Sequence, residues 1–164
     1  MTKPIDIAAW SHVCIRVSDL QRSLGFYRDV LGFEVLADMA VGGEPLEKAL
    51  GGQKGASGRT LFGRIGGQHV EIIRLDNVPV DESISSSLGD IRPYPIYGVG
   101  TFTFRVQDIE QAYKDCVSLG IAVESPPIDI DGVQMFFIHD PDGVRIELLQ
   151  LPDSHFAQAA GSPS

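Results

Sequence analysis

The sequence repeats itself, and this repeat limits the possible folds more than any other feature. Residues 12–20 read His-Val-Cys-Ile-Arg-Val-Ser-Asp-Leu, and residues 101–109 read Thr-Phe-Thr-Phe-Arg-Val-Gln-Asp-Ile. Arginine, valine and aspartate are identical, and the apolar positions are in phase. Each stretch is followed by a helical stripe that ends in Leu-Gly, at residues 31–32 and 119–120. Such a pattern predicts two copies of one supersecondary unit.

Both copies are predicted to contain a strand, a helix and three further strands. Alternation of apolar and polar residues predicts the first strand at Trp10–Val17, and Ser18 or Asp19 can cap the helix that follows. Asp108 has the capping position in the second copy. The remaining strands are predicted at Phe33–Ala37, Thr60–Ile65, Gln68–Leu75, Ile121–Glu124, Gln134–His139 and around Glu147.

We therefore expect an α+β protein that consists of two βαβββ modules. The first module is predicted to take residues 1–75 and the second residues 99–151. Residues 76–98, rich in Ser, Pro and Asp, have the composition of a linker, and residues 152–164 that of a flexible tail. A chain of 164 residues with 43% hydrophobic content can bury one sizeable core or two small ones.

Charge and targeting signals narrow the classes of partner. The net charge of −9 disfavours nucleic acid and anionic membranes as partners, and it leaves a cationic ligand open. No apolar run approaches the ~20 residues that a membrane-spanning helix needs, and the N-terminus lacks the apolar core of a secretory leader. We therefore expect a cytoplasmic protein. Cys14 and Cys116 show no Cys-x-x-Cys spacing and are interpreted as packing thiols.

Two predicted strands carry a glutamate on their more polar face. Residues 66–73 and 143–150 both alternate, so that Glu71 and Glu147 point away from the apolar side. The same face of the predicted strands displays imidazoles, hydroxyls, guanidiniums and a thiol: His12, Cys14, Arg16, His69, Thr101, Thr103, Arg105 and Arg145. This concentration indicates a functional surface. The alternative is an internal salt network in which Arg16 and Arg105 neutralise Glu71 and Glu147.

From about residue 10 to residue 151 the chain resembles the vicinal oxygen chelate superfamily, which includes glyoxalases, epimerases, extradiol dioxygenases, fosfomycin-resistance enzymes and bleomycin-binding proteins. The resemblance is carried by residues 12–20 with 26–32, by residues 69–73 and by residues 140–148. It implies that the two modules form a half-open barrel around a cleft. In metal-using members, four positions on the first and last strands of the modules bind a divalent cation.

Those four positions are occupied here by His12, Glu71, Thr101 and Glu147. Imidazole and carboxylate are ligands for Zn, Ni, Co, Mn or Fe, so the resemblance implies a divalent metal ion held by His12, Glu71 and Glu147. Thr101 departs from the family pattern, which usually has a stronger donor at that position. The expected site is therefore one imidazole and two carboxylates, with coordination positions left open for a substrate.

Resemblance to the glyoxalase and epimerase members implies a lyase or isomerase that acts on a small molecule with neighbouring oxygens. The metal would stabilise an enolate, and Glu71 or Glu147 would be the catalytic base. Oxygen-dependent ring cleavage prefers two imidazoles and one carboxylate, and Thr101 argues against it. We expect the substrate to be bound by other side chains of the same face: Arg16, His69, Thr101, Thr103, Arg105 and Arg145.

Two other functions stay open at this point. A metal-free protein similar to the bleomycin-resistance members would bind a cationic or aromatic small molecule, which agrees with the acidic net charge and with Thr101. A degenerate module would do no more than dimerise. Family members commonly pair, so a homodimer is expected.

Overall fold

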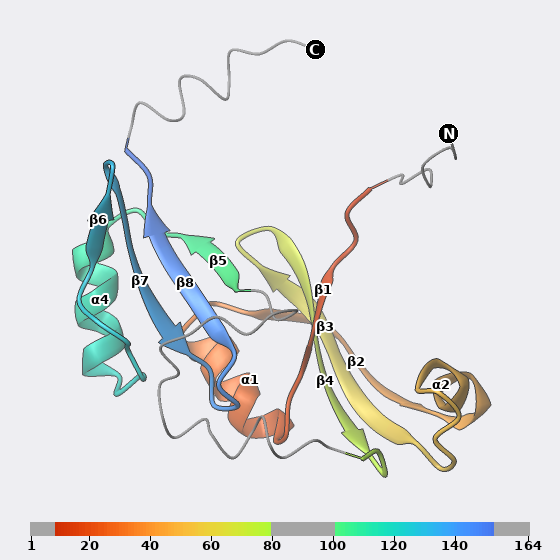
Figure 1. Ribbon diagram of the computed structural model, residues 1–164. Helices are drawn as coiled ribbons and strands as arrows, with labels where there is room; N and C mark the ends of the chain where they lie inside the picture. The colour runs from red at the N-terminus through yellow and green to blue at the C-terminus, as the bar shows by residue number, and fades with distance from the viewer. Residues whose placement is uncertain (1–8, 80–100, 153–164) are drawn as a thin grey trace. The chain divides into compact units, whose positions relative to one another are not determined.

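The computed structural model describes residues 9–79 and 101–152 (Figure 1). The chain divides into two compact units, Met1–Val80 and Asp81–Ser164, and each unit has its own four-stranded sheet. Most of the predicted linker, and the predicted tail from residue 153 on, lie outside the described residues. Within the described ranges, the helices are too short or too polar to cross a membrane.

The first unit is a mixed four-stranded sheet with two helices. The strands lie in the order β1-β4-β3-β2. β1 runs parallel to β4, whereas β3 runs antiparallel to both β4 and β2. The elements follow one another along the chain as β1 (Val13–Arg16), α1 (Leu20–Asp29), β2 (Glu34–Gly42), α2 (Gly43–Ala49), β3 (Ser57–Ile65) and β4 (Gln68–Asp76).

The second unit has the same topology. Its strands lie in the order β5-β8-β7-β6, with β5 parallel to β8 and the other two pairs antiparallel. The succession of one strand, one helix and three strands confirms the repeat that the sequence predicts. The elements are β5 (Phe102–Arg105), α4 (Ile109–Ser118), β6 (Ile128–Ile130), β7 (Val133–His139) and β8 (Arg145–Gln150).

Each main helix begins after an aspartate that caps it. The carboxylate of Asp19 accepts hydrogen bonds from the backbone amides of Gln21 and Arg22 in the first turn of α1, and that of Asp108 accepts one from the amide of Gln111 in α4. Such a cap stabilises a helix by about 1 kcal/mol because it satisfies otherwise unpaired amides. Ser18, the other predicted candidate, is not the cap; its hydroxyl accepts a hydrogen bond from the side chain of Arg22.

The apolar side of each sheet is buried together with the apolar side of its helix. Figure 1 shows α4 lying along the sheet of β7 and β8. Burial of one large apolar side chain contributes about 1.5–3 kcal/mol, so these faces hold the units together and leave the opposite faces to polar groups. The buried set includes Ile15, Leu20, Tyr27, Phe33, Val70 and Ile72 in the first unit, and Ile109, Phe136, Ile138, Ile146 and Leu148 in the second.

The strand predicted at Ile121–Glu124 is shorter than expected. The structure has a single bridge there, from Val123 to Ile138, and the regular strand β6 begins only at Ile128. Ala122 and Glu124 still hydrogen-bond the backbone of β7, and the pairing stops before Pro126-Pro127, which have no backbone N–H to donate to a neighbouring strand. The first unit has no proline between Phe33 and Gly42, and there β2 continues to Gly42, five residues beyond the predicted end at Ala37.

A two-residue turn sets the register of the last two strands in the first unit. Gly66 and Gly67 have φ values of 54° and 85°, a combination that a two-residue hairpin turn requires and that glycine adopts without strain. The turn pairs Ile65 with Gln68, so that Phe62 lies opposite Glu71. The turn therefore places Glu71, on the polar face of β4, on the same side of the sheet as Phe62 of β3.

The corresponding turn in the second unit depends on a buried carboxylate. Asp140 is 5% exposed, and its Oδ1 accepts hydrogen bonds from the backbone amides of Asp142 (2.9 Å) and Val144 (2.7 Å). Across this turn β7 and β8 pair so that Phe137 lies opposite Glu147. Different turns therefore produce the same relation between a phenylalanine and a glutamate.

Candidate functional site

The two glutamates occupy equivalent positions in the two sheets. Glu71 on β4 pairs with Cys14 on the parallel strand β1, and Glu147 on β8 pairs with Thr103 on the parallel strand β5. In both strands the residues before and after the glutamate are buried, whereas the glutamate itself is half-buried. Each carboxylate therefore lies on the face that the helix does not cover.

His12 and Glu71 lie close together in the first unit. His12 directly precedes β1, and its Nε2 is 3.4 Å from Oε2 of Glu71. The two side chains are 34% and 23% exposed, so a ligand can reach both. The structure thus brings together two of the three residues that the sequence predicts as metal ligands.

A buried threonine fixes the orientation of Glu71. The hydroxyl of Thr60 on β3 donates a hydrogen bond to Oε1 of Glu71 at 2.7 Å, and Thr60 is only 2% exposed. The sequence prediction missed Thr60. It could have been found from the Gly66-Gly67 turn, which places Phe62 opposite Glu71 and Thr60 two residues further along the same face.

Phe62 lies between two imidazoles on this face. The ring of His12 meets it edge to face, with centroids 5.5 Å apart, and the ring of His69 stacks on it at 5.3 Å. His69 is a predicted substrate-binding residue, and the structure places it beside the His12 and Glu71 pair through this shared aromatic neighbour. Phe62 is a second residue that the prediction missed.

Cys14 is a neutral thiol next to Glu71. Removal of water from the sulfur, followed by the charge of the Glu71 carboxylate and a hydrogen bond to it, raises the pKa of the Cys14 thiol to about 11. At neutral pH the thiol therefore keeps its proton and donates to the carboxylate. Since a metal ligand or nucleophile must be the thiolate, Cys14 does not act as either in this state.

The second unit holds Glu147 with a different threonine. The hydroxyl of Thr103, directly opposite on β5, donates a hydrogen bond of 2.7 Å to Oε2 of Glu147. Thr101 is exposed and directly precedes β5, as His12 precedes β1. The sequence predicts both threonines as substrate-binding residues, and that role stays a prediction.

Arg145 belongs to an ion cluster in the second unit. Its guanidinium makes two hydrogen bonds to Glu124, at 2.7 and 2.9 Å, and lies over the ring of Phe137 at 3.5 Å from the centroid. Nε2 of His139 is 2.8 Å from the same carboxylate. The hydrogen bonds from Arg145 and then from His139 hold the pKa of Glu124 below its ordinary value. Glu124 was not among the predicted site residues.

The remaining predicted residues lie further along the same strands. Arg16 on β1 pairs with Ile73 and Arg105 on β5 pairs with Leu149, in each case two residues beyond the glutamate. Both arginines are exposed. Their predicted contacts with a substrate, or with the glutamates in a salt network, stay predictions.

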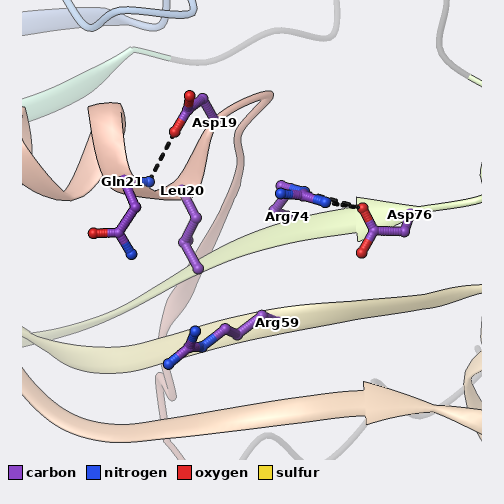
Figure 2. Close-up of a pocket in the computed structure, with 6 residues that line it drawn as sticks. All are labelled: Asp19, Leu20, Gln21, Arg59, Arg74 and Asp76. Carbon is purple, nitrogen blue, oxygen red and sulfur yellow. Dashed lines mark hydrogen bonds and ion pairs between the residues drawn. The ribbon is translucent and has the colours of Figure 1, made fainter.

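A pocket of about 180 Å³ lies on the opposite, helix-covered side of the first sheet. Figure 2 shows it at the beginning of α1, lined by Asp19, Leu20, Gln21, Arg59, Arg74 and Asp76. Its charges are already paired: Arg59 contacts Asp38 at 2.6 Å, Arg74 contacts Asp76, and Asp19 caps the helix. The pocket is therefore a less suitable ligand site than the polar face with Glu71.

The donor atoms of the first unit fit a divalent metal ion. Imidazole nitrogen and carboxylate oxygen bind such ions at ~2.0–2.2 Å, so two ligands of one ion lie ~2.8–3.6 Å apart. The 3.4 Å between His12 and Glu71 is within this range. Across residues 9–79 and 101–152, no three His, Cys, Asp or Glu side chains gather as a metal-binding group. Glu147 belongs to the second unit, and its role as third ligand stays a prediction.

Comparison with known proteins agrees with this geometry. The chain matches the model of the Glyoxalase/Bleomycin resistance protein/Dioxygenase superfamily over residues 10–148. It is 27% identical to metallothiol transferase FosB of Staphylococcus epidermidis over 146 residues, which cover 88% of this chain and 82% of that protein. It is 29% identical to lactoylglutathione lyase of Pseudomonas aeruginosa over 154 residues, which cover 86% of this chain and 81% of that protein.

Solved structures agree as well. A glyoxalase family protein from Bacillus cereus matches with a TM-score of 0.73 and 16% sequence identity, over 93% of this chain and 99% of that one. This likeness confirms the predicted α+β class with two βαβββ modules. The family match spans both copies of the repeat and includes His12, Glu71, Thr101 and Glu147. The chain therefore belongs to the glyoxalase/bleomycin resistance protein/dioxygenase superfamily, which the sequence resemblance predicted under the name vicinal oxygen chelate.

Proposed function

We propose that this protein is a glyoxalase-like metalloenzyme, a lyase or isomerase that transfers a proton on a small substrate with two neighbouring oxygens. The observation that carries the proposal is the pair of His12 and Glu71, whose donor atoms lie 3.4 Å apart on the accessible polar face of the first unit. The other oxygen of Glu71 is held by Thr60. A ligand set of this kind combines suitable donors with a fixed orientation.

The proposed metal ligands are His12, Glu71 and Glu147. The ion is one of Zn, Ni, Co, Mn or Fe, since these accept imidazole together with carboxylate. When bound, it supplies Lewis acidity, which stabilises negative charge on a substrate oxygen. Thr101, at the fourth family position, adds at most a weak neutral donor, so positions remain for the two substrate oxygens.

The proposed base is Glu71 or Glu147. Its carboxylate takes the proton from the carbon next to the substrate carbonyl, and the electron pair of that C–H bond moves toward the carbonyl oxygen. In an isomerisation the carboxyl group returns the proton to the former carbonyl carbon, while the hydroxyl proton of the first carbon moves to the former carbonyl oxygen. In an epimerisation a second acid delivers a proton to the opposite face of the same carbon, and the first carboxyl group later loses its proton to water. The outcome is an isomerisation or epimerisation without any external oxidant.

The substrate would contact the polar side chains around the carboxylates. Among the proposed residues, His69 is the best placed to contact a substrate, because its ring is exposed and stacks on Phe62 beside Glu71. Arg145 uses two of its five N–H groups on Glu124 and retains others for a substrate oxygen. The complete proposed set is Arg16, His69, Thr101, Thr103, Arg105 and Arg145.

The relatives support small-molecule chemistry without fixing its class, because one is named a transferase and the other a lyase. Two features of the site favour proton transfer. Glu71 and Glu147 are both carboxylates that can serve as general bases. Cys14, the thiol next to Glu71, keeps its proton at neutral pH, which argues against thiol chemistry at that position.

A metal-free binding protein is the second candidate function. The specific observation in its favour is Thr101, which stands in the second unit where His12 stands in the first and lowers the number of strong metal donors. The net charge of −9 would favour a cationic small molecule. This function does not require the short distance between His12 and Glu71, and for that reason we favour the metalloenzyme.

Metal content tests the proposal directly. We expect protein purified without chelator to contain a stoichiometric divalent metal by elemental analysis, and metal-free protein to gain thermal stability when Zn²⁺, Ni²⁺, Co²⁺, Mn²⁺ or Fe²⁺ is added. His12→Ala should abolish both effects. Glu44→Gln is the matched control, because Glu44 is an exposed residue of α2 that pairs with Lys48.

The opposite result would contradict the metalloenzyme. A protein that contains none of these metals and is stabilised by none of them does not perform the proposed reaction. If the same protein is stabilised by a cationic aromatic antibiotic in the same thermal assay, the binding-protein function replaces it.

We also propose that the protein forms a homodimer. Among the strands that the structure describes, β2 lies at an edge of its sheet, and three of its apolar side chains are exposed: Val35 by 43%, Leu36 by 55% and Met39 by 47%. Exposed apolar residues along an unpaired edge are typical of an interface. Light scattering after size-exclusion chromatography should give twice the mass of the chain, and Leu36→Glu should shift the protein toward the monomer.

A further inference from the structure

Each candidate glutamate has one oxygen that is hydrogen-bonded to a threonine hydroxyl. In the first unit, Thr60 donates to Oε1 of Glu71 at 2.7 Å and leaves Oε2 toward His12. In the second unit, Thr103 donates to Oε2 of Glu147 at 2.7 Å and leaves Oε1 available. An ionised carboxylate only accepts hydrogen bonds, so the hydroxyl must be the donor in both pairs.

The two threonines come from different neighbouring strands. Thr103 lies directly opposite Glu147 on the parallel strand β5. Thr60 lies on the antiparallel strand β3, where it pairs with Ile73 and reaches Glu71 diagonally. The same interaction is therefore made from opposite sides of the glutamate strand in the two copies of one fold.

The strand pairing identifies the residue that occupies, in the other unit, the position of each threonine. The position of Thr103 is taken in the first unit by Cys14, which pairs with Glu71 as Thr103 pairs with Glu147. The position of Thr60 is taken in the second unit by Met135, which pairs with Leu149 as Thr60 pairs with Ile73. Each glutamate thus has one threonine and one sulfur-containing residue at its two flanking positions.

Local structure suits these threonines to a positioning role. A β-branched side chain has restricted χ1 freedom, which limits the directions its hydroxyl can take. Thr60 is 2% exposed, so water does not compete for its hydroxyl. Its other acceptor, the backbone oxygen of Ile72, lies at 3.5 Å and is much weaker than the 2.7 Å contact with Glu71.

We infer that Thr60 and Thr103 are positioning residues that hold Glu71 and Glu147 in the orientation for metal binding, one from each flanking strand. The inference rests on the proposed function, because it assigns both glutamates to the metal. It gives Thr103 a role toward Glu147 in addition to its predicted contact with substrate. Partners that orient metal ligands commonly change metal affinity by about 10–100-fold when removed.

Calorimetric titration of the metal-free protein with Mn²⁺ and with Zn²⁺ tests the inference. Thr60→Val keeps the shape of the side chain and removes the donor, so we expect affinity to fall by about 10–100-fold. Thr60→Ser keeps the hydroxyl and should bind within a few-fold of the wild type. Thr103→Val should cause a smaller loss, because Thr103 is exposed and water can partly replace its hydroxyl, and Thr103→Ser should restore binding.

The controls separate positioning from stability. Ser118→Ala removes a hydroxyl that bonds the backbone oxygen of Asp115 on α4, and it should leave metal affinity unchanged. Thermal unfolding of every variant reports on folding. If Thr60→Val fails to fold, the exposed Thr103→Val and the serine variants still test the same claim, since a merely structural role would not produce rescue by serine.

The outcomes distinguish this inference from the proposed function. If the wild type binds Mn²⁺ or Zn²⁺ and both valine variants bind equally well, the positioning role is wrong and the metalloenzyme stands. If both serine variants lose as much affinity as the valine variants, the hydroxyl is not the cause and the inference is again wrong. If the wild type binds none of Zn²⁺, Ni²⁺, Co²⁺, Mn²⁺ and Fe²⁺, both proposals are wrong; if it binds only Ni²⁺, Co²⁺ or Fe²⁺, the same variants are titrated with that ion.

Discussion

The two units share a framework and differ in the chemistry around their glutamates. In both, an aspartate caps the helix, a phenylalanine lies opposite the glutamate, and a threonine holds the carboxylate. The first unit surrounds its phenylalanine, Phe62, with the imidazoles of His12 and His69. The second covers Phe137 with Arg145, which is itself bound to Glu124.

This difference indicates a division of roles between the copies. Imidazole gives up its proton easily and binds metal ions, so the first unit has the groups that suit a metal. In the second unit the imidazole of His139 contacts Glu124, whose charge is already paired with the guanidinium of Arg145, so this cluster suits structure and the recognition of an anionic oxygen. A duplicated fold can therefore keep its register while the side chains beside each glutamate differ.

The largest expected effect is the loss of folding stability when a buried side chain of either unit is shortened, which tests whether both copies have a packed core. Ile72 and Leu148 directly follow the two glutamates and are 0% and 4% exposed. Ile72→Ala and Leu148→Ala should each lower the free energy of unfolding by about 2–5 kcal/mol in urea denaturation. Val117→Ala, at a 54% exposed position, should stay within about 0.5 kcal/mol of the wild type. A cost below about 1 kcal/mol at either site would mean that its unit lacks a tight core.

Metal affinity of two matched variants shows whether the copies share one site. Glu71→Gln and Glu147→Gln keep the shape of the side chain and remove the negative charge. We expect each to weaken Mn²⁺ binding by at least about 100-fold, because loss of a direct ligand should exceed the 10–100-fold cost of losing its partner. Calorimetry measures this effect. If only Glu71→Gln weakens binding, the metal belongs to the first unit alone and Glu147 is not a ligand.

The ion cluster of the second unit predicts a dependence of stability on pH. Glu124→Gln removes the charge that pairs with Arg145, and it should cost about 1–2 kcal/mol at pH 7, less than a buried pair would because Arg145 is 39% exposed. In the folded protein the pKa of Glu124 lies below its ordinary value of 4.5. Its stabilisation is therefore complete above about pH 5 and is lost as the pH falls through the folded pKa.

Urea denaturation between pH 7 and pH 3 measures that difference. The gap between wild type and Glu124→Gln should be constant from pH 7 to about pH 5 and should narrow below it. A gap that widens as the pH falls would have the wrong sign and would refute the assignment of the depressed pKa to the folded state.

The smallest expected effect tests whether the hydroxyl can be moved between strands. Cys14→Thr gives the first unit the threonine that the second has at Thr103. In a Thr60→Val background, we expect it to recover part of the lost Mn²⁺ affinity, by about 10-fold or less, because the new hydroxyl is exposed. Cys14→Val in the same background has no donor and should recover nothing. Equal affinities of the two double variants would show that the two flanking positions are not interchangeable.

The alternation of apolar and polar residues and the turn residues predicted much of the order of strands and helices, because these signals are local. The repeat, the aspartate caps and the Gly66-Gly67 hairpin each depend on neighbours within a few residues along the chain. The strand predicted at Ile121–Glu124 is reduced to a bridge for a local reason as well, since Pro126 and Pro127 prevent the pairing from continuing along the chain.

The amino-acid sequence by itself determined the duplicated βαβββ order and which face of each strand is polar, because side-chain alternation follows from the backbone alone. Only the tertiary structure decided which partners share that face. Thr60 reaches Glu71 across 11 positions of the chain, and Thr103 reaches Glu147 across 44. Strand register sets such contacts, and register depends on how the whole sheet buries its apolar side.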